Sequence, residues 1–205
     1  MVKLIVEGGG GKDNQALQVD ARKAFHKLLE KAGFKGRMPS IIVAGGRSAA
    51  YDRYKTLVRQ KESTVLLIDS EKSVEAKFFG KPWDFLKSFE NWDWEADLDN
   101  ANCHLMVQCM EAWFYADKDC LVEYYGHKFR VGSLSSRPIE EIEKDKCIDS
   151  IKQAASQCKT KKGYDKGRDS FEILMGLSPE KLKKASPWAD RFFKELDRIL
   201  GVVKR

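Results

Sequence analysis

The chain has 205 residues, of which 42% are hydrophobic and 33% are charged, a balance typical of a globular protein that can bury a core. Its longest aliphatic run, residues 65–68, is far too short to cross a membrane, and the first residues lack the apolar stretch of a secretory signal. We therefore expect a cytoplasmic protein. The five cysteines show no C-x-x-C spacing, which argues against a disulfide framework or a zinc site.

The net charge of +6 is unevenly distributed along the chain. Residues 151–205 contain 14 basic and 7 acidic residues, so they carry +7, whereas residues 1–150 carry −1. A basic segment beside a neutral part that bears carboxylates suits a polyanionic partner such as nucleic acid. The alternative is a solvated helical surface, on which lysines are common.

The first third of the chain alternates predicted strands and helices. Apolar runs at 3–6, 40–44 and 64–68 each end at a glycine or an acidic residue, and the segments between them repeat apolar residues at spacings of three and four. The third run is apolar at consecutive positions, as expected for a strand covered on both faces. This order predicts an α/β fold with a parallel sheet flanked by helices.

The later chain is predicted to be mostly helical. Residues 90–99 are acidic and contain no lysine or arginine, so we interpret them as a solvated loop. Residues 104–107 are predicted as a fourth strand, with a helix over 108–116; a continuous helix over 102–117 is the alternative. We therefore divide the chain into an α/β core over 1–125 and a basic, helical C-terminal extension over 126–205, packed on the core as one structural unit.

Three acidic residues directly follow predicted strands. Glu7 ends the first strand, and Asp69 and Glu71 end the third. Because the carboxyl ends of parallel strands meet at one sheet edge, we expect these carboxylates to converge. Clustered carboxylates repel unless protons or a divalent ion neutralise them, and oxygen-only ligands favour Mg²⁺ or Mn²⁺. Each acid alone is more often a helix cap or a loop residue; the joint pattern predicts the cation site.

A glycine run, Gly8 to Gly11, precedes Lys12 and invites comparison with a phosphate-binding P-loop. That motif requires a glycine where Val6 stands and a hydroxyl where Asp13 stands, so the P-loop interpretation fails. A glycine loop before a helix can still approach a phosphate through its backbone N–H groups, the alternative being a flexible turn. Arg47, at the next predicted helix start, is a second candidate phosphate contact.

The pattern Val6-Glu7-Gly8 followed by Ile68-Asp69-Ser70-Glu71 resembles the Toprim fold of topoisomerases, primases, recombination proteins and nucleases of the overcoming-lysogenisation-defect type. The Toprim motif places a glutamate after the first strand and D-x-D after the third. Here Glu71 replaces the second aspartate, which keeps the charge but lengthens the reach. The resemblance implies that Glu7, Asp69 and Glu71 bind metal for phosphodiester chemistry.

Three segments carry a closer resemblance: Glu7–Asp13, His104–Phe114 and Tyr164–Arg168. Together they resemble a small prokaryotic Toprim-like family of unknown function, often encoded beside AAA-type ATPases in defence-like gene clusters. The resemblance covers nearly the whole chain. In similar defence proteins a Phe/Met-Glu-x-Trp helix start lies beside the acidic site, which implies a catalytic part for Glu111; an ordinary acid on a helix surface is the alternative.

The segment 161–168 mixes basic residues, glycines and the aromatic Tyr164. Such a segment can follow a nucleic-acid backbone and stack a base, although a plain solvated loop is the commoner outcome. The residues expected to hold the substrate backbone are Lys12, Arg47, Lys162, Lys166 and Arg168.

The sequence thus leads us to expect a metal-dependent nuclease acting on DNA or RNA. We expect it to be the effector of a defence-type system that works with a partner ATPase. The sequence leaves its oligomeric state open. A non-catalytic Toprim-like regulatory or binding subunit of an ATPase complex is the alternative. Nucleotidyl transfer of the primase sort is a weaker third hypothesis, because it needs a nucleotide site that the sequence does not reveal.

Overall fold

A four-stranded parallel sheet forms the centre of the molecule. The computed structural model describes residues 1–10, 14–89, 98–159, 161 and 163–202. Within these residues the strand order is β2-β1-β3-β4, and all three neighbouring pairs are parallel. The strands are β1 (Lys3–Val6), β2 (Ser40–Val43), β3 (Thr64–Asp69) and β4 (Cys103–Met106). The predicted α/β fold, a parallel sheet flanked by helices, is therefore confirmed.

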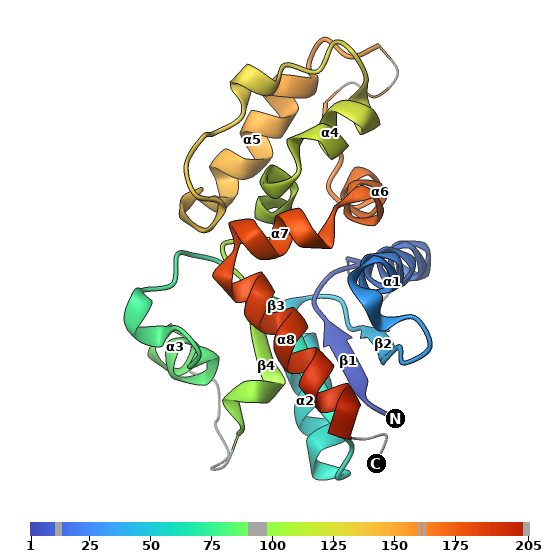
Figure 1. The fold of residues 1–205 in the computed structure, drawn as a ribbon, viewed down its shortest axis with the longest axis vertical. Coiled ribbons are helices and arrows are strands. Elements are labelled where there is room, and N and C mark those ends of the chain that lie inside the picture. The colour runs from blue at the N-terminus through green and yellow to red at the C-terminus, as the bar shows by residue number, and fades with distance from the viewer. Residues whose placement is uncertain (11–13, 90–97, 160, 162, 203–205) are drawn as a thin grey trace.

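Helices surround this sheet and extend beyond it (Figure 1). In the described residues they are α1 (Gln15–Leu29), α2 (Arg47–Arg59), α3 (Pro82–Phe89), α4 (Lys118–Tyr125), α5 (Lys144–Ala155), α6 (Arg168–Gly176), α7 (Pro179–Ala185) and α8 (Pro187–Val202). None of these helices is both long and apolar enough to span a lipid bilayer.

The two faces of the sheet are buried under different helices. In β1, Leu4 belongs to the same buried cluster as Phe25 of α1, whereas its neighbour Ile5 belongs to the cluster of Tyr54 from α2 and Leu86 from α3. All five side chains are at most 1% exposed. Successive side chains of a strand point to opposite faces of the sheet, so neighbouring residues pack against different helices. Burying one such side chain stabilises the fold by about 1.5 to 3 kcal/mol.

The ambiguous segment after residue 102 resolves as a strand. Cys103–Met106 pairs with β3, which confirms the predicted fourth strand and excludes a continuous helix. The predicted helix over 108–116 instead forms 3-10 turns over Met110–Ala116. An α-helix cannot start at 108, because Gln108 has a φ of +65° and the chain reverses there.

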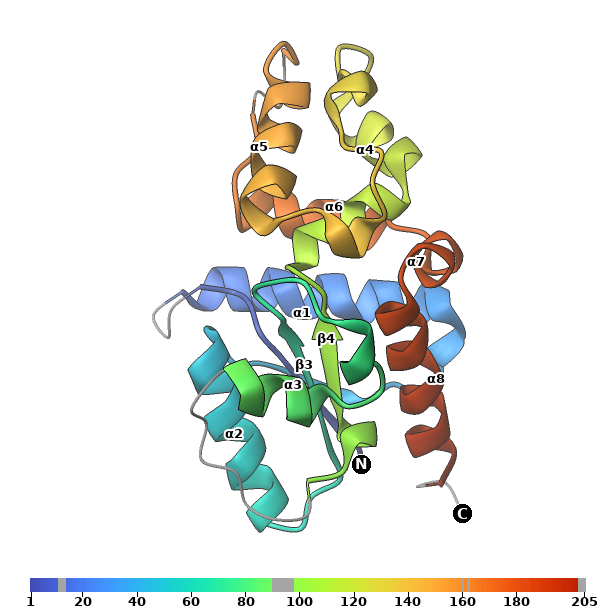
Figure 2. The same ribbon diagram turned by 90° about the vertical axis from the view of Figure 1, so that its left-hand side faces the viewer.

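The chain after β4 builds a helical lobe and then returns to the sheet. Figures 1 and 2 show α4 and α5 beyond the carboxyl ends of the strands, with α6 between this lobe and α1. Helix α8 runs back along β4, where Arg191 donates to the carbonyl of Cys103 (3.0 Å). Helices α4 and α5, which precede and follow the predicted boundary at residue 125, lie together in this lobe. Most of the predicted acidic loop, residues 90–97, lies outside the described residues.

Two glycine loops meet at the carboxyl ends of β1 and β2. The N–H of Gly8 donates to the carbonyl of Gly45 (2.8 Å). Gly45 has a φ of +84°, and a Cβ there would lie 2.9 Å from the carbonyl oxygen of Gly10. Only glycine therefore fits this position, and the backbones of the two loops close on one another beside the strand ends.

We predict that Gly45→Ala lowers the free energy of unfolding by about 1 to 3 kcal/mol, because the new methyl group meets backbone and the φ is unfavourable. Gly46→Ala is the matched control: Gly46 has a φ of −72°, and nothing lies within 4 Å of a Cβ built there. Its effect should stay within about 1 kcal/mol. Urea unfolding of both variants measures the difference, and equal losses would contradict the loop geometry.

Candidate metal centre

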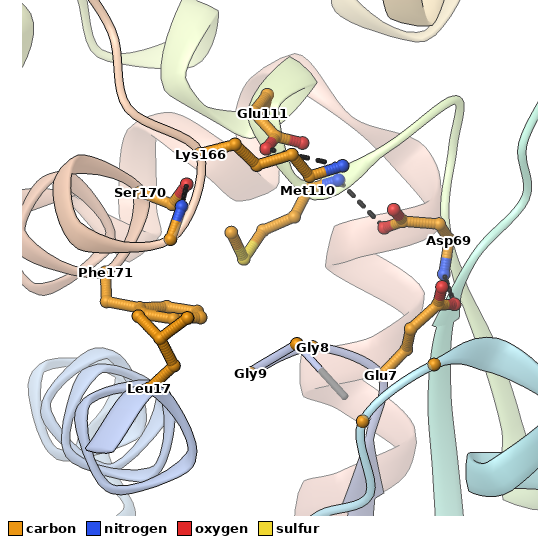
Figure 3. Close-up of a pocket in the computed structure, with 14 residues that line it drawn as sticks. Glu7, Gly8, Gly9, Leu17, Asp69, Met110, Glu111, Lys166, Ser170 and Phe171 are labelled. Atoms are coloured by element: carbon orange, nitrogen blue, oxygen red, sulfur yellow. Dashed lines mark hydrogen bonds and ion pairs between the residues drawn. The ribbon is translucent and has the colours of Figure 1, made fainter. Parts of the chain in front are cut away.

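A cavity of about 450 Å³ opens at the carboxyl ends of the strands (Figure 3). Its walls come from the loops after β1 and β2, the end of β3, the segment after β4 and the start of α6. The cavity therefore combines backbone from the early chain with side chains from the helical lobe, at the place where parallel α/β sheets bind their ligands.

Three carboxylates converge where β1 and β3 end, and two of them, Glu7 and Asp69, line this cavity. Glu7, Asp69 and Glu71 each offer an oxygen, and these oxygens lie within 4.8 Å of one another. Glu71 adopts a φ of +64°, and its N–H donates to the carbonyl of Gln108 (3.0 Å). A non-glycine residue rarely holds this backbone conformation unless its surroundings impose it. The convergence that the sequence predicted is thus present, and these three residues are the group that could hold a hard cation.

The backbone fixes the central carboxylate. Oδ1 of Asp69 accepts from the N–H of Met110 (2.9 Å), and the N–H of Asp69 donates to Oε2 of Glu7 (3.1 Å). The guanidinium of Arg47 donates to the carbonyl of Asp69. These bonds join the ends of β1, β3 and β4 to the start of α2. Asp69 is therefore oriented before any ligand arrives, which a metal ligand requires.

Burial makes the charged forms of these acids costly. Burial raises the pKa of Asp69 well above its ordinary value, and the charges of Glu7 and Glu111 raise it further. Burial also raises the pKa of Glu7, against the opposing effect of the Arg47 guanidinium. Both groups hold protons more tightly than exposed acids do, so a cation that binds here must displace protons, and its affinity should rise with pH.

No pattern in the sequence indicates that Lys144 belongs to this site. Its Nζ donates to both carboxylate oxygens of Glu71 (2.6 Å each) and lies 3.9 Å from Oδ2 of Asp69. Burial alone would lower the pKa of Lys144, but the hydrogen bonds with Glu71 and the charges of Asp69 and Glu71 raise it. Lys144 begins α5 in a run of mixed charges, which is typical of a solvated helix, and no local signal marks its role.

Glu111 lies at the cavity, held by residues of the distant segment 161–168. The hydroxyl of Tyr164 donates to Oε1 of Glu111 (2.9 Å) and lies 2.5 Å from Oγ of Ser170. Oε2 of Glu111 is buried without a hydrogen-bond partner, and Nζ of Lys166 lies 4.0 Å from Oε1 (Figure 3). Tyr164 is only 8% exposed, so the expectation that it stacks a base is wrong.

The basic residues expected to contact phosphate do not all lie at the cavity. Lys166 lines the cavity, whereas Arg47 directly follows the lining residue Gly46 and donates to the carbonyl of Asp69. Arg168 is exposed, and its Nε donates to the buried Asp169 (3.0 Å), so it also has a structural contact. Lys12 and Lys162 lie outside the described residues.

These observations define a class: a parallel α/β protein with an acidic site at the strand ends, closed over by a helical lobe. A family model described as "Domain of unknown function (DUF4276)" matches residues 12–197, and the chain belongs to this family. The matched range includes Asp69, Glu71, Glu111 and Lys144 and begins after Glu7. Searches of curated proteins and of solved structures found no match.

We predict that Mn²⁺ raises the melting temperature of the wild type, because a cation that binds only the folded state stabilises it, by about 2.7 kcal/mol at a concentration of 100 times Kd. A Glu7→Gln, Asp69→Asn double variant should lose this stabilisation, measured by calorimetry. A Glu172→Gln, Asp190→Asn variant, altered at two surface acids on α6 and α8, should keep it. Equal stabilisation of wild type and the first variant would rule out the site.

We also predict that Lys144→Met tightens Mn²⁺ binding by about 1 kcal/mol, roughly fivefold in Kd, because a competing positive charge is removed from Glu71. Isothermal titration calorimetry measures this change. Lys146→Met, two residues along α5 and paired with Glu143 on the surface, is the control and should bind as the wild type does. Unchanged or weaker binding in Lys144→Met would show that Glu71 does not face the cation.

Proposed function

We propose that this chain is a metal-dependent nuclease that hydrolyses phosphodiester bonds in DNA or RNA. One observation carries the proposal: three carboxylates from two adjacent strand ends lie within 4.8 Å of one another, and two of them, Glu7 and Asp69, line an open cavity. Glu7, Asp69 and Glu71 would hold Mg²⁺ or Mn²⁺, which such oxygen ligands prefer. The donor set fits a hard cation, because no sulfur or imidazole ligand stands among the three.

When bound, such a cation supplies an activated water and stabilises the charge that develops on the phosphate. Asp69 is oriented for this work by the N–H of Met110, and Glu7 by the N–H of Asp69. Lys144 places an ammonium group beside Asp69 and Glu71, and Lys166 places one beside Glu111, so positive charge that suits a polyanionic substrate stands next to the acidic groups. Burial raises the pKa of both Glu7 and Asp69, so either group holds a proton more tightly than an exposed acid does and could take part in proton transfer.

The wider setting of the proposal comes from the sequence. Residues 151–205 carry +7, which suits nucleic acid, and the Toprim resemblance rests on Glu7, Asp69 and Glu71, the same residues that form the acidic cluster. The closer resemblance, which rests on Glu7–Asp13, His104–Phe114 and Tyr164–Arg168, leads us to propose the effector of a defence-type system that works with an AAA-type ATPase. A cytoplasmic location is proposed because the sequence shows neither a secretory signal nor a membrane-spanning run.

A second candidate function is a non-catalytic, Toprim-like subunit that binds such an ATPase. The bidentate bond between Lys144 and Glu71 favours it, because an ammonium group already neutralises part of the acidic cluster without a metal. A non-catalytic protein that keeps the Toprim-like fold would need only this ion pair, and no metal, to offset the acidic charges. Metal binding separates the two candidates, since only the nuclease requires it.

We predict that Glu7→Gln and Asp69→Asn each lower cleavage by about two orders of magnitude or more, because both remove oxygens from the same cation. The double variant should be no worse than the single variants, since residues that act as a unit fail together. The assay measures Mg²⁺- and Mn²⁺-dependent cleavage of tRNA, single-stranded and duplex substrates, with and without a neighbouring ATPase. Nucleic-acid binding and circular dichroism should stay nearly unchanged.

Glu172→Gln is the matched control for cleavage, because Glu172 is an exposed acid on α6 that pairs with Lys161 outside the cavity. Undiminished cleavage by Glu7→Gln or Asp69→Asn would contradict the proposed mechanism. If the wild type cleaves none of these substrates under any metal and partner condition, the binding subunit is the better account.

A further inference from the structure

The two metal-site carboxylates that line the cavity, Glu7 and Asp69, occupy one side of it. Away from Asp69, the wall is formed by the apolar side chains of Leu17, Met110 and Phe171, and two polar groups, Glu111 and Lys166, adjoin them (Figure 3). A cation and a phosphate need no apolar wall. A volume of about 450 Å³ is in the range of pockets that enclose small organic molecules. This part of the cavity therefore has a use that the metal chemistry does not explain.

Glu111 is a hydrogen-bond acceptor without enough donors. Its side chain is 1% exposed, Oε1 accepts from the hydroxyl of Tyr164, and Oε2 has no partner. A buried acceptor left unsatisfied destabilises the folded protein, and the effect is larger when the acceptor is charged. Tyr164 and Ser170 hold the carboxylate in place, so the unsatisfied oxygen is a fixed feature of the wall. A ligand with N–H groups would relieve this destabilisation.

Lys166 adds a donor beside that acceptor. Its Nζ lies 4.0 Å from Oε1 of Glu111, and its side chain is 55% exposed, so it can shift toward a ligand oxygen at little cost. The cavity thus offers a carboxylate acceptor and an ammonium donor next to each other, above an aromatic ring and a thioether. Flat, apolar faces with a polar edge are the shape that such a wall recognises.

Guanine presents the matching edge. Its N1–H and exocyclic amino group are adjacent donors, which one carboxylate can accept together, and its O6 beside them accepts from an ammonium group. Adenine and cytosine each place an unprotonated ring nitrogen next to their amino group, and that lone pair would face the carboxylate. Uracil and thymine offer one N–H between two carbonyls. Guanine alone therefore satisfies both oxygens of Glu111 together with Lys166.

We propose that this cavity binds a guanine base, with Glu111 accepting from N1–H and the 2-amino group, Lys166 donating to O6, and Phe171 and Met110 contacting the ring. The inference rests on the proposed function for its biological setting, since it places a guanine beside the phosphodiester to be cleaved. It makes Glu111 a specificity-determining residue that touches the base. The base contacts themselves involve none of the three carboxylates that would hold metal.

The test measures binding of guanosine, inosine and adenosine in EDTA by ligand-observed NMR titration. We expect guanosine to bind at least about tenfold more tightly than adenosine, with inosine, which lacks the 2-amino group, in between. Glu111→Gln should abolish the preference, and Glu172→Gln, the same change on α6 outside the cavity, should keep it. Equal binding of the three nucleosides by the wild type, or an unchanged preference in Glu111→Gln, would overturn the proposal.

A second variant covers the case in which Glu111→Gln fails to fold. Lys166→Met should weaken the binding of guanosine and of inosine, which both carry O6, and leave the binding of adenosine unchanged. Equal weakening of the binding of all three nucleosides would overturn the proposal.

The experiments also distinguish failure of the guanine pocket from failure of the nuclease proposal. If the protein selects guanosine but cleaves no nucleic acid, the guanine-binding proposal is supported and the nuclease proposal is contradicted. If it cleaves nucleic acid with no preference for guanine near the cut, only the guanine-binding proposal is contradicted.

Discussion

Mutual repulsion among the carboxylates of Glu7, Asp69 and Glu71 is the constraint that the surrounding structure has to meet. Within the described residues the sheet below them is apolar, so water cannot screen their charges from that side. Backbone N–H groups, the Arg47 guanidinium and the Lys144 ammonium offset part of the repulsion. Burial and neighbouring charges still raise the pKa of Asp69 well above its ordinary value. A bound divalent cation would offset the remaining repulsion, which is the basis of the proposed metal site.

The arrangement of the chain follows from this constraint. The loops after β1 and β2 bring backbone close together through positive-φ glycines, and the loops after β3 and β4 are joined through Glu71 and Gln108. These loops form the floor of the cavity, while the helical lobe supplies Lys144 and Lys166 from far along the sequence. The lobe therefore completes the site instead of only covering the sheet, and its removal would take away both ammonium groups.

The sequence predicted the parts of the site that depend on local pattern. Apolar runs located the strands, and because Glu7 and Asp69 directly end two of them, their meeting could be inferred from the geometry of a parallel sheet. Residues 104–107 were ambiguous because four apolar residues fit a strand or a buried helix, and only pairing with β3 decides between them. Arg168 was assigned to substrate on charge alone, which could not reveal its bond to Asp169.

Other parts of the site depend on contacts that no local pattern records. Lys144 meets Glu71 across 73 residues, and Tyr164 meets Glu111 across 53. Each stands in a segment whose composition is typical of a solvated surface, so its role follows only from how the helical lobe packs on the sheet. The unsatisfied oxygen of Glu111, from which the guanine site is inferred, is likewise a property of packing and not of sequence.

Anomalous diffraction from a crystal soaked in Mn²⁺ would reveal whether Glu7, Asp69 and Glu71 bind one cation. We expect a manganese peak within bonding distance of all three carboxylates, with the ammonium of Lys144 displaced from Glu71. The absence of a peak there, with Lys144 still bound to Glu71 at saturating Mn²⁺, would show that these residues do not form a cation site.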